Sequence, residues 1–92
     1  MRSEDWIEGT VLRVIDGDMF MLRVENEGPN NDYPYGPLET VQLGKGAPAP
    51  STAAAVKARR KLVALVGGKR VHCYVLGRDQ NGVLRCDVTV IA

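Results

Sequence analysis

The sequence predicts a mostly β fold with one helix, namely a five-stranded OB-type Greek-key barrel in the order β-β-β-α-β-β. Three observations predict it. Five segments are rich in β-branched or alternating apolar residues, tight-turn residues separate most of them, and one alanine-rich segment with helical spacing precedes the fourth. The chain has 92 residues, which suits a single domain over 1–92 with a core over about 6–91.

A hairpin, a loop and a third strand are expected in the first half. Residues 6–15 read as a strand in which a glycine marks a bulge or bend, and residues 19–24 read as its partner across an Asp-Gly-Asp turn. Residues 25–37 hold three prolines and two glycines and predict a loop. Residues 38–43 alternate apolar and polar side chains, as a half-buried strand does.

A helix and a second hairpin are expected in the second half. Residues 53–66 have helical spacing, and Gly67 stands where a left-handed C-cap is expected. Residues 70–76 and 83–91 read as the last two strands. The stripe of the helix that faces the barrel is expected to hold Ala55, Ala58, Leu62 and Leu65, with Val66 beside them.

Two cysteines lie on the core-directed faces of the last two strands, so buried free thiols are expected. A two-residue loop at 79–80 would place Cys73 opposite Cys86, whereas a turn at 81–82 would place Cys73 opposite Val90. The second register has the better turn chemistry, so no disulfide is predicted. No Cys-x-x-Cys motif or His/Cys cluster suggests a zinc site.

The charges are unevenly distributed, although the net charge is only +1. Residues 1–39 hold nine acidic and three basic residues, whereas residues 40–78 hold eight basic residues and no acidic one. Such asymmetry indicates a surface that faces a polyanion, and ordinary charge pairing between the two halves is the alternative. The candidate nucleic-acid-binding residues are Lys45, Lys57, Arg60, Lys61, Lys69, Arg70 and Arg78.

Two further features bear on partners. Tyr33 and Tyr35 of the long loop either stack nucleic-acid bases or pack the loop onto its own barrel. No uncharged run, that of residues 62–68 included, is long enough to span a bilayer, so no membrane partner is expected.

Four motifs, in their order and spacing, resemble the staphylococcal nuclease (thermonuclease) family over roughly residues 9–91. They are Val14-Ile15-Asp16-Gly17-Asp18, Val41-Gln42-Leu43 leading to Ala47-Pro48, the alanine-rich helix ending in Leu65-Val66-Gly67-Gly68-Lys69-Arg70-Val71, and Asp79-Gln80-Asn81-Gly82. The resemblance implies the barrel fold. Active members of the family are calcium-dependent enzymes that cleave phosphodiester bonds of DNA or RNA. Members usually continue into further helices, so the chain resembles a C-terminally short member.

The resemblance also implies site residues, and it marks the chain as a degenerate member. Asp18 matches a calcium ligand of the family, with Asp16 beside it. Of the two arginines that neutralise the phosphate, one is replaced by Gln42 and the other by Val83. Arg85 lies two residues beyond Val83 and is a possible substitute.

The glutamate that activates water in the family has no match either. With a gap placed before Gly46 it falls on Ala49, and without a gap it falls on Pro50. Both alignments lack the base, because no acidic residue lies between Glu39 and Asp79. Losing one such electrostatic group commonly costs on the order of 10²–10³ in rate. Calcium needs about six to eight oxygen ligands, so the two aspartates predict at most a weak calcium site, and turn formation alone also explains them.

Three functions are therefore considered. The leading hypothesis is a catalytically inactive nuclease-like module that binds nucleic acid or another polyanion. The first alternative is a calcium-dependent phosphodiesterase with an altered site at Asp16 and Asp18. The second is a protein-interaction or assembly domain with no nucleic-acid role, acting as a homodimer or through contacts within a longer parent protein. The sequence assigns no compartment.

Overall fold

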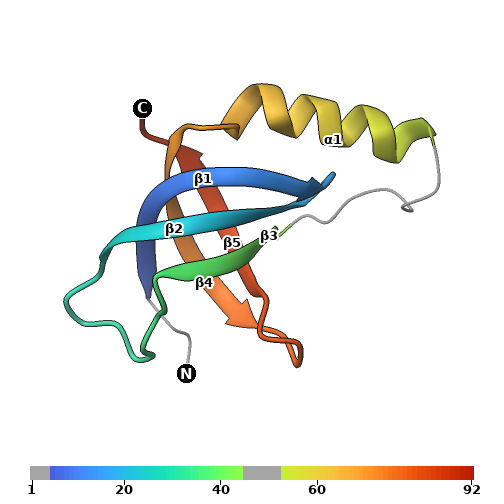
Figure 1. Cartoon of the computed structure of the whole chain (residues 1–92). Coiled ribbons are helices and arrows are strands. Elements are labelled where there is room, and N and C mark those ends of the chain that lie inside the picture. Colours follow the sequence, from blue (N-terminus) through green and yellow to red (C-terminus); the bar gives the residue numbers. More distant parts are fainter. Residues whose placement is uncertain (1–4, 45–52) are drawn as a thin grey trace.

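The computed structural model describes residues 5–44 and 53–92, and it has the predicted element order (Figure 1). The elements are β1 (Trp6–Asp16), β2 (Met19–Glu27), β3 (Leu38–Leu43), α1 (Ala53–Val66), β4 (Arg70–Arg78) and β5 (Leu84–Val90). The helix has the bounds that were predicted for it. Strands β2 and β4 continue beyond the predicted segments, because barrel pairing extends them into polar sequence.

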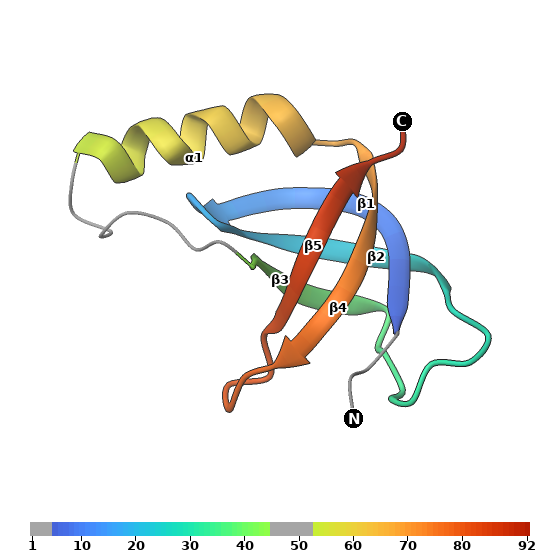
Figure 2. The ribbon, with the colours of Figure 1, turned by 180° about the vertical axis from the view of Figure 1, so that it is seen from behind.

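The strands close into a barrel in the order β1-β2-β3-β5-β4, and β4 pairs back onto β1. Neighbouring strands are antiparallel except for the parallel pair of β3 and β5. Helix α1 lies along one end of the barrel, against β1, and the β4–β5 hairpin lies at the other end (Figures 1 and 2). This is the OB-type barrel that the element order predicted.

The barrel interior is apolar and takes residues from every strand, while α1 adds two residues that close one end. These two are Leu62 and Val66, which lie four residues apart on one helix face. Leu65, predicted to share that face, is 54% exposed. The buried strand residues include Ile7, Val11, Phe20, Leu22, Val41, Val71, Cys73, Val75, Leu84 and Cys86.

Glycines mark two of the irregular points in the backbone. The pairing of β1 with β2 shifts register between Glu8 and Gly9, which confirms the bulge predicted at this glycine. At the end of α1 the left-handed residue is Gly68, with φ of 69°, rather than Gly67. The predicted cap is one residue too early, because the Gly67 N–H still donates a helical bond to the Val63 carbonyl at 2.9 Å.

The β4–β5 hairpin adopts neither of the two registers weighed from the sequence. The observed pairs are Cys73–Val88 and Val75–Cys86. Asp79 N donates to the Val83 carbonyl, and Gly82 takes a φ of 84°, so the connection is a three-residue loop with a left-handed glycine. Both cysteines are buried free thiols, as predicted.

Candidate functional site

The Asp-Gly-Asp turn between β1 and β2 lies beside the end of β3, where Asp18 meets Gln42, the residue that the resemblance aligns with an arginine. Asp18 is 7% exposed, and its carboxylate accepts a hydrogen bond from Gln42 Nε2 at 2.9 Å. The Asp18 carbonyl accepts a second bond from Leu43 N at 2.7 Å. The structure thus brings Asp18 and Gln42 together. The neutral Gln42 amide is hydrogen-bonded to the carboxylate that the resemblance aligns with a calcium ligand.

The two aspartates of this turn accept hydrogen bonds from nearby groups of the protein. The Asp16 carboxylate accepts a bond from Gly17 N at 2.8 Å, which is the local turn role expected of an aspartate. Within residues 5–44 and 53–92, no group of three or more His, Cys, Asp or Glu side chains could hold a metal. Because calcium binds about six to eight oxygen ligands, the two aspartates alone would supply only a minority of its coordination shell.

The acidic residue nearest in sequence to the missing base is engaged elsewhere. Glu39 is buried at the start of β3 and accepts a hydrogen bond from Gly36 N at 2.9 Å. Its other carboxylate oxygen pairs with the Arg78 guanidinium at 3.2 Å. A carboxylate held in this way is poorly placed to activate water. Ala49 and Pro50, the two positions with which the resemblance can align the base, lie outside the described residues.

Arg85 lies beside the end of β3, close to the Asp-Gly-Asp turn. Val83 is uncharged and belongs to the loop of the β4–β5 hairpin. Val83 N donates to the Asp79 carboxylate at 3.0 Å within the hairpin loop. Arg85 lies directly beside Gln42 in the parallel β3–β5 ladder, and its Nη2 donates to the Gly44 carbonyl at 3.2 Å. The sequence indicated Arg85 only by its distance from Val83. Its position beside Gln42 depends on pairing between strands whose paired residues lie 43 positions apart in the chain.

Three of the basic candidates lie together on α1. Lys57, Arg60 and Lys61 are exposed on the helix face opposite Leu62 and Val66. The helix contains no acidic residue. Because α1 rises about 1.5 Å per residue, these charges are spread over about 6 Å of its axis. The exposed Lys69 follows in the turn after the helix.

The remaining basic candidates lie elsewhere or are paired. Arg70 forms an ion pair with Glu25, with Nε 3.3 Å from the carboxylate oxygen. Arg78, at the other end of the barrel, pairs with Glu39. Charge pairing between the two halves of the chain, the alternative weighed from the sequence, therefore applies to these two arginines. Lys45 lies outside the described residues.

A buried carboxylate that sequence reasoning missed organises the long loop. Asp5 is 1% exposed, and it accepts hydrogen bonds from Asp32 N at 2.7 Å, Tyr33 N at 3.2 Å and the Tyr35 hydroxyl at 2.6 Å. Burial, together with this bond to Asp5, raises the pKa of the Tyr35 hydroxyl well above its usual range. Tyr35 therefore packs the loop onto the barrel. Tyr33 is 62% exposed, so only Tyr33 of these two tyrosines is accessible to a ligand.

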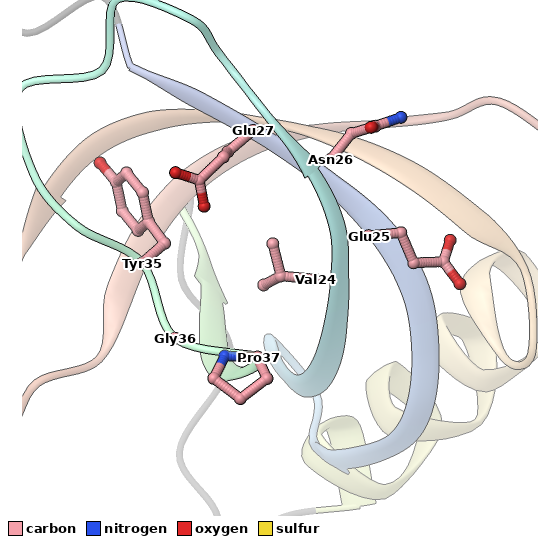
Figure 3. Close-up of a pocket in the computed structure, with 7 residues that line it drawn as sticks. All are labelled: Val24, Glu25, Asn26, Glu27, Tyr35, Gly36 and Pro37. Carbon is pink, nitrogen blue, oxygen red and sulfur yellow. The ribbon is translucent and has the colours of Figure 1, made fainter.

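A small hollow of about 140 Å³ lies under this loop, between β2 and residues 35–37 (Figure 3). Glu27 points toward the hollow, whereas Glu25 points away from it (Figure 3). Hydrogen bonds from Arg23 and Thr10 hold the pKa of Glu25 below its usual range. An acidic lining of this kind does not suit a polyanion.

Comparison with protein-family models, curated proteins and solved structures finds no match to this chain. The fold and the charged residues define its class: a closed five-stranded barrel with one helix between β3 and β4 and an exposed basic face on that helix. The resemblance to the staphylococcal nuclease family rests on the four sequence motifs alone. In the part of the chain that the structure describes, no helix is long and apolar enough to cross a membrane.

Proposed function

We propose that this chain is a non-catalytic, staphylococcal nuclease-like barrel that binds nucleic acid or another polyanion through the outward face of α1. The observation that carries the proposal is the group of Lys57, Arg60 and Lys61, exposed on a helix with no acidic residue. Among the described residues, none of the three forms an ion pair with a carboxylate. An uncompensated basic face attracts polyanions, and release of their counterions contributes to affinity.

The site residues support the non-catalytic part of this proposal. Gln42 and Val83 stand where two arginines are needed, and neither alignment supplies the base. The Asp18 carboxylate accepts a hydrogen bond from the Gln42 amide. Transition-state charge on a phosphate would therefore meet little of the stabilisation that phosphodiester cleavage requires.

The test is binding of a fluorescent single-stranded DNA, followed by anisotropy at several salt concentrations. Affinity is expected to fall steeply as salt rises. The double variant Lys57→Gln/Lys61→Gln should reduce the slope of log K against log salt by about 1.4, because each lost phosphate contact on a single strand contributes about 0.7. The matched control is Arg13→Gln/Arg23→Gln, which removes two exposed charges from β1 and β2. Salt-independent binding, or equal losses in both doubles, contradicts the proposal.

The second candidate is the phosphodiesterase with an altered site, favoured by Arg85 lying beside Gln42. The assay incubates the protein and single-stranded DNA with calcium and then with EDTA. We expect no cleavage above background. Cleavage that is lost both with EDTA and in Asp18→Ala would establish the enzyme instead.

The third candidate, an assembly domain, is favoured by Val56 and Val63, which are large exposed apolar residues of α1. Light scattering over a range of protein concentrations tests this candidate. A monomer throughout the range argues against a homodimer, whereas a dimer that does not bind DNA would favour this candidate over polyanion binding.

A further inference from the structure

The C-terminal part of β5 has an edge that no described strand covers. On one side β5 pairs with β4 all the way from Leu84 to Val90. On the other side it pairs with β3 only from Leu84 to Cys86. Within residues 5–44 and 53–92 no strand pairs with this second edge beyond Cys86, and in Figure 2 β4 is the strand that runs alongside the C-terminal part of β5. Residues 87–90 therefore present an open strand edge.

The backbone groups that point to this edge can be identified from the neighbouring strand pair. The Cys86 carbonyl accepts a hydrogen bond from Gly44 N at 3.0 Å, on the side of β3. The N–H and C=O groups of successive residues alternate between the two sides of a strand. Those of Val88 and Val90 therefore point the same way as the Cys86 carbonyl, whereas those of Thr89 point to β4. Within the described residues, the groups of Val88 and Val90 have no hydrogen-bond partner on the open edge.

This edge lacks the features by which proteins usually prevent pairing with another chain, such as lysines, prolines and bulges. Residues 87–92 contain no lysine, arginine, proline or glycine, and residues 88–91 are all β-branched. The register of β5 against β4 is regular from Cys86 to Val90. Val90 is 42% exposed, although it is a large apolar residue. The edge is therefore suited to pairing with a further strand.

We propose that the open edge of β5 pairs in antiparallel orientation with the same edge of a second copy of this chain, which forms a two-fold symmetric dimer. Thr89 lies on the axis, opposite Thr89 of the second copy, and Val88 lies opposite Val90 of the second copy. In this register Val88 and Val90 exchange both backbone hydrogen bonds across the interface. Every free N–H and C=O group of the edge is then paired.

The side chains of β5 favour a second copy over an unrelated strand. Val88 packs against the core, and Val90 shares its strand face, so pairing covers the exposed Val90 with Val88 of the second copy. On the outer face two threonines meet at the axis, which is a favourable cross-strand pair. Asp87 is the one charged residue of residues 87–92, and it lies opposite Ile91 rather than opposite Asp87 of the second copy. The strand is thus complementary to itself in backbone, shape and charge.

The first test measures dimerisation by analytical ultracentrifugation between about 10 μM and 1 mM protein. A weak dimer that forms as the concentration rises is expected, because two short strands bury little area. Val90→Lys should raise the dissociation constant by about tenfold or more, since an ammonium group would be placed against Val88 of the second copy. The matched control Val63→Lys adds the same charge at an exposed valine of α1 and should leave dimerisation unchanged.

The second test uses cysteine cross-linking to check the register. Residues that face each other on the axis have Cα atoms about 4.5 Å apart, which is within the range of a disulfide. Thr89→Cys should therefore form a disulfide-linked dimer under oxidising conditions. Asp87→Cys is the control, because its two copies would lie about 14 Å apart along the strands and should stay unlinked. Equal cross-linking of the two variants would overturn the register.

Amide hydrogen exchange of the unmodified chain, followed by NMR, needs no variant. The amides of Val88 and Val90 should exchange rapidly in dilute protein and more slowly as the dimer forms, whereas the Thr89 amide, which faces β4, should be protected throughout.

Three results would overturn the dimer: a monomer at every concentration, dimerisation weakened by Val63→Lys but not by Val90→Lys, or a dimer in which the exchange of Val88 and Val90 is not slowed. A monomer at every concentration would assign the edge instead to an extended segment of another protein. Lys57→Gln/Lys61→Gln should dimerise normally, so polyanion binding by α1 and pairing through β5 can fail separately.

Discussion

At the scale of single residues, Gly9 is a position where the backbone leaves no room for a side chain. A Cβ there would lie 1.9 Å from the Arg23 carbonyl oxygen of the paired strand. Gly9→Ala is therefore expected to force β1 and β2 apart and to lower the free energy of unfolding by about 3 kcal/mol. The control is Gly77→Ala, where a Cβ meets open space. Urea unfolding measures both, and similar midpoints for the two variants would contradict the close approach.

Tyr35 and Tyr33 form a second matched pair at this scale. Tyr35→Phe leaves the buried Asp5 carboxylate without one hydrogen bond and should cost about 1–3 kcal/mol, whereas Tyr33→Phe should cost little. Urea unfolding at neutral pH measures both costs. Equal stability of the two variants would show that the bond to Asp5 contributes nothing.

The raised pKa of Tyr35 makes stability depend on pH in the alkaline range. Since the folded state favours the neutral phenol, this contribution is fully present below the unfolded pKa of about 10 and is lost as pH rises above it. Urea unfolding between about pH 9 and 11 should therefore show a steeper loss of stability in the wild type than in Tyr35→Phe. Parallel curves would contradict the assigned pKa direction.

At the scale of elements, the rotation of α1 about its axis decides which leucine stabilises the barrel. Leu62 is buried against the strands and Leu65 is not, although spacing alone placed both on one stripe. Leu62→Ala should destabilise by about 2–5 kcal/mol, and Leu65→Ala by less than about 0.5 kcal/mol. Thermal unfolding monitored by circular dichroism compares them. The reverse order of stability would mean that the helix docks through a different face.

The β4–β5 hairpin shows how an element can be predicted while its register is not. Turn residues between the strands identified the connection, yet Cys73 pairs with Val88 rather than with either predicted partner. Three-residue and two-residue loops use the same glycine and asparagine chemistry. A bulge between Val75 and Gly77 and the closure of β4 onto β1 also influence the pairing. Neither of these leaves a clear local signal in the sequence.

At the scale of the whole molecule, barrel closure shields the two thiols. Cys73 and Cys86 are both fully buried, and a hydrogen bond between the Cys86 thiol and Cys73, together with burial, raises the pKa of Cys86. Native protein should therefore react with a thiol reagent only as fast as the barrel opens, with a rate that rises with urea as unfolding does. Rapid labelling in native buffer would show that the barrel opens locally.

The sequence by itself determined the element order, the helix bounds and the absence of any acidic residue between Glu39 and Asp79. Local patterns suffice for these, because turn residues, side-chain alternation and helical spacing act within a few positions. The tertiary structure alone decided where the charges lie and which of them are paired. Arg85 meets Gln42 and Asp5 meets Tyr35 only because strands distant in sequence pair across a closed barrel. For the same reason the basic block separates into an exposed group on α1 and two paired arginines.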